Sequence, residues 1–534
     1  MSTRRPVALG VDVGTTHVKV LALSLEGEVL AVARADTPMS DDGTGPVHEA
    51  GALATLVTQL AHEATETADG AIRSVAVASI GEEGFWLDRA DRVTYPSLAW
   101  YAPRPTPEFE SFARERGAWA FERCGVLADP IRTLAKWMWL RAAHPEALAE
   151  ARTWLSVSEY LAFCWSGVKV MTRSQASRTL LWDLKRERVL VDLLADLSFD
   201  PDCLAPVVPS GTVLGPLRSD ALPGSLRTAD ATVIAAGHDH PVGAYAAGVV
   251  ASGQILDSLG TAESLMMPTA AARPKRWMIT QGLEFGASAG GLPHYVMAAS
   301  HSGAHLKAWT SLLCRDAARL EREAEEVPPG AGGLRLHPPG WRMGQEGALL
   351  GLGPDASAAA LFRSLLEGWA FWSRLALERL GPVAEPPSSA DRKPPGAGSR
   401  TRTRAGTTIE QEAEASGPVP LTAIGGGSEW PLAMRIRASV LGRDIETVDA
   451  PEAVALGSAR LALAAVRPDM PGARIPHRRI SPDPTLQDVY DGLYRRWLSE
   501  TDGLGAILNV HDETRRSPIT GQSGGTTKRG EPTC

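Results

Sequence analysis

The feature of this sequence that most constrains the fold is a segment near the start of the chain, residues 7–23. Residues 7–11 form an apolar run rich in branched side chains, which is typical of a buried strand. Residues 18–23 resume the apolar pattern after a polar turn, residues 12–16. We therefore predict two strands joined by a polar turn, at the start of a mixed sheet with helices packed on it.

The turn carries side chains that suit a phosphate ligand. Gly14 lets the backbone approach a ligand closely, and the hydroxyl groups of Thr15 and Thr16 can contact phosphate oxygens together with backbone N–H groups. Asp12 would repel phosphate, so its natural partner is a Mg²⁺ ion bound to that phosphate, and Lys19 could supply compensating positive charge. An ordinary hairpin with a polar turn is the alternative interpretation.

Length and charge limit the classes of architecture and partner. A chain of 534 residues is too long for one compact core, so two large domains are expected. Hydrophobic residues make up 44% and charged residues 22%, which is ordinary for a globular protein. The net charge of 54 − 62 = −8 gives no electrostatic reason to expect nucleic acid or an anionic membrane as a partner.

The cysteines and the apolar runs indicate a compartment. Five cysteines are scattered without a C-x-x-C pair, which favours reduced thiols in the cytoplasm over a disulfide framework or a zinc site. The hydrophobic start of the chain is interrupted by Asp12, His17 and Lys19, so it is not expected to be a signal peptide or a membrane span. We expect a cytoplasmic protein that binds neither nucleic acid nor a membrane.

A second chemical motif follows the apolar run at residues 231–236, which we predict to be a buried strand. Asp239 would then lie at the carboxyl end of a strand and at the start of a helix, where open α/β sheets bind ligands. Its carboxylate could accept the proton of an attacking hydroxyl group as a general base. A helix N-cap is the alternative role, and both can hold at once. The neighbouring His238 and His240 are rival bases that we expect to be packing residues.

Residues 254–265 resemble the opening segment weakly, with a strand, a Gly260-Thr261 turn and another strand. This second possible phosphate loop suggests that a second domain begins near residue 250 and repeats the plan of the first. We therefore assign residues 1–249 and 250–512 to two domains, followed by an unstructured tail at 513–534.

Residues 382–420 differ from the rest of the second half. The segment is rich in Pro, Gly, Ser, Thr and charge and has almost no large apolar side chains, so we predict a disordered insert. Order is expected to return with a strand at 421–424, which ends in Gly425, Gly426 and Gly427. Bare backbone at these glycines would let a flat ligand lie against the chain, although a tight strand-to-helix turn would need the same residues.

Other motifs are absent or weak. No G-x-x-x-x-G-K-[ST] loop occurs, and no strand-linked G-x-G-x-x-G marks a dinucleotide fold. His301 and His305 are spaced to share a helix face, but no Glu follows His301 and no third ligand is evident, so a metal site there is disfavoured.

The order of these motifs along the chain, rather than any one of them, carries a resemblance. Together with residues 347–354 and 366–371, and with the Glu-Ala…Leu-Gly-Ser-Ala run at 452–459, they resemble the FGGY family of carbohydrate kinases. The resemblance covers residues 7–466 apart from 382–420. It implies an α/β protein with the actin-like ATPase fold, in which two ribonuclease-H-like domains face each other across a catalytic cleft.

The resemblance also implies roles for the motif residues. ATP would be the phosphate donor and Mg²⁺ the metal, with Asp12 near the ion and Asp239 as the base. The phosphate groups would contact both turns, and the adenosine would lie on the glycine loop. The expected ATP-binding residues are Gly14, Thr15, Thr16, Lys19, Gly260, Thr261, Gly425, Gly426 and Gly427. Arg435 stands where many relatives have Gln, which puts the adenine contacts in question.

In this family the segments near residue 81 and residues 100–104 usually contact the sugar. Here they contribute Glu82, Glu83, Trp100 and Arg104, which we expect to bind the substrate. Many members carry W-x-D-x-R, but Ala102 stands where that Asp would fall, and the Gln-Met-His-Gly pattern of xylulose kinases is absent. The W-x-x-P-R form with Glu83 looks more like kinases of deoxy-ketoses such as L-fuculose. Core packing is the alternative role for Trp100.

We therefore expect an ATP- and Mg²⁺-dependent kinase that phosphorylates a hydroxyl group of an L-fuculose-like or xylulose-like ketose or a related polyol. The partner is a small-molecule sugar, and a homodimer is left open as the oligomeric state. Two other functions stay open: a different actin-like ATPase, and a non-catalytic sugar or nucleotide sensor on the same scaffold.

Overall fold

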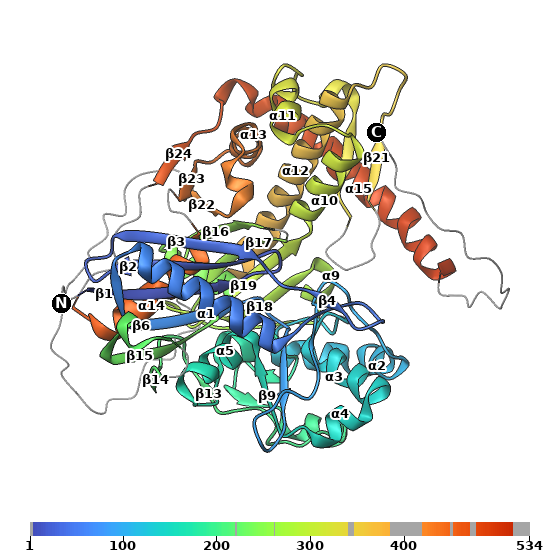
Figure 1. The fold of residues 1–534 in the computed structure, drawn as a ribbon. Coiled ribbons are helices and arrows are strands. Elements are labelled where there is room, and N and C mark those ends of the chain that lie inside the picture. Colours follow the sequence, from blue (N-terminus) through green and yellow to red (C-terminus); the bar gives the residue numbers. More distant parts are fainter. Residues whose placement is uncertain are drawn as a thin grey trace, which may run out of the picture.

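The computed structural model describes residues 4–218, 222–260, 262–339, 347–384, 419–448, 452–469 and 477–515. Two mixed sheets with helices on their faces make up the molecule (Figure 1). The first sheet has the order β14-β15-β6-β1-β2-β3. Its strands are β1 (Arg5–Val13), β2 (His17–Ser24), β3 (Val29–Asp36), β6 (Gly70–Ser79), β14 (Val213–Pro216) and β15 (Arg227–His238).

The predicted opening hairpin is confirmed. β1 and β2 pair antiparallel, and the register places Asp12 opposite Lys19 at the turn. β1 then pairs parallel with β6, and β6 pairs parallel with β15. The carboxyl ends of these three parallel strands therefore meet at one edge of the sheet. Asp12 lies near the end of β1 at this edge, and residue 80 and Asp239 directly follow β6 and β15.

The second sheet has the order β18-β19-β17-β16-β22-β23-β24. β16 pairs antiparallel with β17 and parallel with β22, and β22 pairs parallel with β23. The run β19-β17-β16-β22-β23 thus repeats the run β3-β2-β1-β6-β15, which confirms that the second half follows the plan of the first. These strands are β16 (Ile255–Leu259), β17 (Glu263–Thr269), β18 (Leu283–Ala287), β19 (His294–Ser300), β22 (Leu421–Ile424), β23 (Ile445–Val448) and β24 (His477–Ile480).

Helices cover both faces of the first sheet because its central strands are apolar on both faces. Val7, Leu9 and Val11 of β1 pack with α1 (Ala50–Thr67) and α5 (Val157–Ser166). The alternate residue Ala8 packs on the opposite face with α8 (Asp239–Ala246) and α14 (Ala453–Val466). Such two-sided burial is typical of the parallel part of an α/β sheet.

The helix α14 comes from the second half of the sequence but packs against the first sheet (Figure 1). The approach is close: a Cβ atom on Gly10 would lie 1.9 Å from the carbonyl oxygen of Ala455 and 2.2 Å from the backbone nitrogen of Ala459. The helix α8 packs against α14 and also, through Ala244 and the C-cap residue Ala247, against the second sheet. The division near residue 250 therefore separates the two sheets but not their helical layers.

A mostly helical layer extends the first half beside its sheet, around the buried Trp86, Trp137 and Trp154. Short strand pairs tie its loops together. Its helices are α2 (Pro107–Cys124), α3 (Thr133–Ala143), α4 (Pro145–Glu150), α6 (Arg173–Ala176) and α7 (Val191–Asp196). Its short strands are β4 (Ser40–Asp41), β5 (Pro46–His48), β7 (Gly84–Leu87), β8 (Ser97–Leu98), β9 (Thr153–Ser156), β10 (Met171–Thr172), β11 (Trp182–Asp183), β12 (Arg188–Val189) and β13 (Val207–Val208).

The second half has a corresponding helical layer, in which α12, α13 and α15 share a core with α11. Its helices are α9 (Met278–Gln281), α10 (Ser302–Leu312), α11 (Ala317–Glu325), α12 (Ala358–Ala384), α13 (Pro431–Leu441) and α15 (Gln487–Arg515). A short strand pair, β20 (Arg335–His337) and β21 (Ala348–Leu350), lies beside α12. In the part of the chain that the structure describes, no helix combines the length and the apolarity that a membrane span requires.

Two boundaries differ from the sequence-based expectation. The helix α12 continues through Pro382 to Ala384, because a proline close to the end of a helix removes few backbone hydrogen bonds; the remainder of the expected insert, 385–418, lies outside the described residues. The helix α15 reaches Arg515, beyond the expected start of the tail at 513, and 516–534 lie outside the described residues. The sequence analysis missed α15 entirely. The buried Tyr490, Tyr494 and Trp497 anchor it in the core.

The contact at Gly10 leads to a prediction about stability. Gly10→Ala should lower the free energy of unfolding by at least about 2 kcal/mol, because the added methyl group has no room against α14. Gly51→Ala is the matched control, since Gly51 is exposed on α1 with open space around its Cβ position, and it should leave the stability unchanged or raise it slightly. Thermal melting of both variants checks this, and equal melting temperatures would contradict the role given to Gly10.

Candidate active site

A cavity of about 920 Å³ lies where the strand ends of the two sheets face each other. Residues of both halves line it, including most of the residues that the sequence pointed to. The predicted residues in its lining are Asp12, Gly14, Thr15, Thr16, Lys19, Glu82, Trp100, Asp239, Gly260, Gly425, Gly426 and Gly427. Thr261 lies outside the described residues.

The turn after β1 is tight, and Asp12 at its start is only 4% exposed. The backbone nitrogen of Gly14 donates to the carbonyl oxygen of His17 at 3.1 Å, which closes the turn. Oδ2 of Asp12 lies 3.4 Å from Nζ of Lys19, whereas Oδ1 is buried and has no hydrogen-bond partner in the described part of the chain. Burial raises the pKa of Asp12 to about 6. A cation near Oδ1 would satisfy this carboxylate.

Lys19 also joins the two halves. Its Nζ lies 2.8 Å from Oε2 of Glu452, the residue before α14, while the same ammonium group faces Asp12. Glu452 lines the cavity and has a φ of 55°, a left-handed conformation that is uncommon outside glycine. The sequence analysis noted Glu452 only as part of a motif; its pairing with Lys19 depends on α14 reaching the first sheet.

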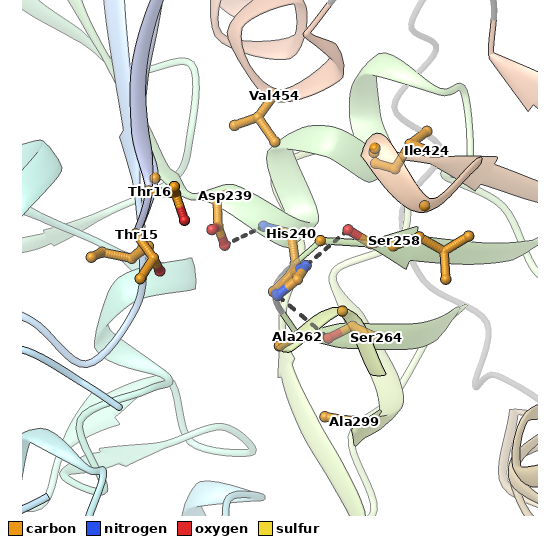
Figure 2. A pocket seen from close by; sticks show the side chains of 18 of the residues that line it. Thr15, Thr16, Asp239, His240, Ser258, Ala262, Ser264, Ala299, Ile424 and Val454 are labelled. Carbon is orange, nitrogen blue, oxygen red and sulfur yellow. Dashed lines mark hydrogen bonds between the residues drawn. The ribbon is translucent and has the colours of Figure 1, made fainter. Parts of the chain in front are cut away.

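Asp239 is the first residue of α8, and His238 rather than Asp239 occupies the N-cap position. Oδ1 of Asp239 accepts a hydrogen bond from the backbone nitrogen of His240 at 2.6 Å and lies 3.2 Å from Nε2 of His238. Figure 2 shows the carboxylate directed toward the side of the cavity that carries Thr15 and Thr16. The charge of Asp239 also contributes to the raised pKa of Asp12, so the two carboxylates lie close enough to interact.

The two histidines beside Asp239, His238 and His240, are held by contacts within the protein. Nδ1 of His240 lies 3.1 Å from the hydroxyl of Ser258 on β16, and Nε2 lies 3.4 Å from the hydroxyl of Ser264 on β17, so this ring connects α8 to the second sheet (Figure 2). Burial lowers the pKa of His238 to about 4, which keeps its ring neutral at pH 7. Both observations agree with packing rather than with the role of general base.

The glycine loop after β22 packs against the turn after β16. A Cβ atom on Gly425, whose φ is 88°, would lie 2.6 Å from the carbonyl oxygen of Leu259. One on Gly427 would lie 2.7 Å from the Cβ of Leu259. Gly426, between them, has no atom within 4 Å of its Cβ position and lines the cavity. The loop therefore presents open backbone to the cavity, as a flat ligand requires. Arg435 does not line the cavity; it pairs with Glu325.

Trp100 belongs to the cavity wall rather than to a core. Its Nε1 donates to the hydroxyl of Thr15 at 2.9 Å, and its ring stacks on His301 from the second half at 6.3 Å between centroids. His305, the other histidine of the disfavoured metal pair, stacks on Trp369. The indole therefore links the turn after β1 to the opposite side of the cavity.

Glu83 and Arg104 lie outside the cavity lining, although we expected them to contact the substrate. Glu83 is fully buried, and its carboxylate accepts a hydrogen bond from the backbone nitrogen of Trp100 at 2.7 Å. Nη1 of Arg104 donates to Asp42 at 2.7 Å, and its guanidinium lies over the ring of Trp139. Both side chains are directed to the protein, where they support the segment that carries Trp100.

Four charged residues line one wall of the cavity and form a buried set that we call the Arg–Glu cluster: Glu82, Arg132, Arg178 and Glu284. Arg132 pairs with both glutamates. Nε of Arg178 donates to Glu82 at 2.8 Å, and its Nη2 donates to Glu284 at 3.2 Å. Although burial opposes ionisation, Arg178 and Arg132 lower the pKa of Glu82 to about 2.

The sequence analysis missed three members of this cluster. Arg132 precedes α3, Arg178 follows α6, and Glu284 lies on β18, so more than 100 residues separate Arg178 from its partner Glu284. No local pattern marks any of them, because isolated arginines and glutamates are ordinary surface residues in a sequence. Only the fold brings them together.

Comparisons with known proteins identify the family and the fold of the chain. Family models of the FGGY family of carbohydrate kinases match residues 7–246 as the N-terminal domain and residues 258–466 as the C-terminal domain. The chain is 27% identical to the xylulose kinase of Streptomyces rubiginosus over 505 residues, which cover 91% of this chain and 93% of that protein.

A second relative is matched only in part. The chain is 27% identical to the L-fuculokinase of Escherichia coli K12 over 277 residues, which cover 50% of this chain and 57% of that protein. The crystal structure of a xylulose kinase from Rhodospirillum rubrum superposes with a TM-score of 0.77 at 23% identity, over 94% of this chain and 100% of that chain, and shows the same fold. The chain belongs to the FGGY family of carbohydrate kinases.

Proposed function

We propose that this protein transfers the γ-phosphate of ATP to a hydroxyl group of a ketose or a related polyol. The observation that carries the proposal is the meeting, in one cavity, of a polar phosphate-type turn from each half, an open glycine loop and the carboxylate of Asp239. The relatives named xylulose kinase and L-fuculokinase support the same reaction class. The two halves, residues 1–249 and 250–512, would act as the two lobes around the substrates.

ATP would lie between the two turns. Gly14 and Gly260 let phosphate groups approach the backbone of the two turns closely, and the hydroxyl groups of Thr15 and Thr16, with a contribution from Thr261, suit phosphate oxygens. The open backbone around Gly425, Gly426 and Gly427 suits the flat adenosine moiety. Lys19 would offset part of the negative charge that the phosphate groups bring.

Asp12 is the residue that fits a Mg²⁺ ion. Its Oδ1 is buried and has no hydrogen-bond partner among the described residues, so a cation would compensate it. In the described ranges no three His, Cys, Asp or Glu side chains gather in a metal-binding group, so phosphate oxygens and water would supply most ligands, as is common for Mg²⁺. When bound, the ion would neutralise charge on the phosphate groups.

Asp239 would hold the sugar hydroxyl and accept its proton. As the proton moves to the carboxylate, the hydroxyl oxygen forms a bond to the γ-phosphorus, and the bond from that phosphorus to the bridging oxygen of ADP breaks. The contacts of Oδ1 with His238 and the nitrogen of His240 fix the orientation of the carboxylate. The cavity would exclude bulk water and so limit wasteful hydrolysis of ATP.

Sugar-stimulated release of ADP from purified protein tests the reaction. A panel of ketoses, polyols and aldonates should contain a substrate that raises ADP release well above the rate without sugar. A sugar-independent ATPase would release ADP equally in every well, and a non-catalytic sensor would release none. Either result would contradict the proposed kinase activity.

With that substrate, Asp239→Asn should lower kcat by at least ~100-fold, because the amide cannot accept the proton of the hydroxyl group. Binding of ATP should persist, as measured by calorimetry. Asp230→Asn is the matched control on β15, the strand that leads to Asp239, since Asp230 is exposed near the other end of that strand, and it should leave kcat unchanged. Near-normal turnover by Asp239→Asn would exclude it as the base.

Asp12→Asn should raise the Mg²⁺ concentration needed for half-maximal activity roughly 10-fold or more, because the amide carries no charge for the ion. Asp36→Asn provides the control, since Asp36 lies exposed at the end of β3 outside the cavity lining. Titration of Mg²⁺ at fixed ATP and sugar measures the effect. An unchanged Mg²⁺ requirement in Asp12→Asn would show that the ion does not depend on this carboxylate.

A further inference from the structure

The Arg–Glu cluster lies at the cavity wall yet is built from both halves of the molecule. Glu82 follows β6, Arg132 precedes α3 and Arg178 follows α6, whereas Glu284 belongs to β18 of the second sheet. Each residue is at most 9% exposed in its side chain, and each lines the cavity. Four charged groups buried beside the substrate space are expensive to desolvate, so their position calls for a reason beyond stability.

The backbone at Glu82 is itself strained. Its φ is 64°, in the left-handed region that a glutamate rarely adopts. The carbonyl oxygen of Glu82 accepts hydrogen bonds from Nζ of Lys136 at 2.9 Å and from the hydroxyl of Thr133 at 3.2 Å, which hold this conformation. Strain that surrounding contacts maintain at a cavity wall is a feature of ligand-binding segments.

The cluster lies next to the carboxylate assigned to catalysis. A Cβ atom on Gly81 would lie 2.9 Å from Nε2 of His238 and 3.3 Å from Cγ of Arg178, so these two side chains flank Gly81. The same Nε2 lies 3.2 Å from Oδ1 of Asp239. A small ligand with one hydroxyl group at Asp239 would therefore bring its remaining groups to the cluster.

Arg178 has one donor available. Its Nε and Nη2 bind Glu82 and Glu284, but its Nη1 is buried and has no hydrogen-bond partner in the part of the chain that the structure describes. The side chain is only 6% exposed, so bulk water does not solvate it freely. An unpaired N–H group of a buried guanidinium costs free energy, and an oxygen atom of a ligand would remove that cost.

The charges around this wall are balanced. In its described part, the carboxylates of Glu82 and Glu284 pair with the two guanidinium groups of the cluster, and the ammonium group of Lys136 interacts with the carboxylates of Glu83 and Glu82. A ligand carboxylate would add a negative charge that no surplus cation compensates in this buried region. A ligand hydroxyl group adds no charge, can accept from Nη1 of Arg178 and can donate to a carboxylate.

We propose that the Arg–Glu cluster, with Nη1 of Arg178 as its donor, binds hydroxyl groups of the sugar and selects uncharged ketoses and polyols over aldonates. This inference rests on the proposed kinase function and specifies its substrate class. It assigns specificity to Arg178 and Glu284. A site built to bind hydroxyl groups through buried polar partners discriminates strongly against ligands that leave those partners unsatisfied.

Kinetics with a matched pair of substrates test the proposal: a ketose that the protein phosphorylates and the aldonate with the same number of carbon atoms. The wild type should show a kcat/KM at least ~100-fold lower for the aldonate. Arg178→Met should raise KM for the ketose at least ~10-fold while KM for ATP stays within about twofold. Arg92→Met, which removes an exposed guanidinium paired with Asp88, is the control and should match the wild type.

The variant Glu284→Gln tests substrate specificity directly, because a residue with only a structural role would not change the preference between the two substrates. Removal of one negative charge should raise the ratio of aldonate to ketose kcat/KM at least ~10-fold. An unchanged ratio in Glu284→Gln, an unchanged ketose KM in Arg178→Met, or a wild type that prefers aldonates would each overturn the proposal. If melting curves show that Arg178→Met is unfolded, Arg178→Lys takes its place, because lysine keeps the positive charge but lacks the several N–H donors of the guanidinium group. A wild-type KM for the ketose in Arg178→Lys would then overturn the proposal.

Calorimetry of ketose binding without ATP separates this inference from the proposed function. If no sugar stimulates ADP release but the wild type binds the ketose and Arg178→Met does not, the kinase activity fails and the binding site stands. If the wild type phosphorylates the ketose and Arg178→Met binds it with unchanged affinity, the kinase activity stands and the specificity site fails.

Discussion

The active-site geometry depends on the close packing of α14 against β1. Gly10 leaves space for the backbone of Ala455 and Ala459, so a helix that follows the last parallel strand of the second sheet lies directly on the first. Asp12 comes two residues after Gly10 on the same strand, and Glu452 at the start of α14 reaches Lys19. One contact without room for a side chain therefore holds α14 directly on the first sheet, where its N-terminal end reaches Lys19.

Charge divides the cavity into two ends with different requirements. Near the turn after β1, Asp12 and Asp239 interact, burial raises the pKa of Asp12, and Oδ1 of Asp12 has no hydrogen-bond partner among the described residues. At the Arg–Glu cluster, the two arginines compensate the charges of the two glutamates and lower the pKa of Glu82 to about 2. Under the proposed function, the first end would hold the phosphate groups with their metal, and the second would hold the neutral hydroxyl groups of the sugar.

Local patterns predicted the parts of the structure that depend on neighbours in sequence. The apolar runs around residues 12–16 and 260 predicted both strand pairs, and the repetition between them predicted the two-sheet plan. The helix α15 was missed because polar residues dominate its sequence. In the structure, Tyr490, Tyr494 and Trp497 are buried and attach this helix to the core of the second half. Glu83 and Arg104 were expected at the substrate, but the direction of a side chain in a loop depends on partners such as Asp42 that lie far away in sequence.

The sequence by itself determined the family, the order of the elements and many of the residues that line the cavity, because strand ends and glycine turns are encoded within a few positions. Only the tertiary structure decided which wall each side chain faces. The Arg–Glu cluster joins segments from four separate places in the chain, and the packing of α14 joins a late segment of the sequence to the first sheet. Both are long-range contacts, and they form only when burial of apolar surface brings the two sheets together.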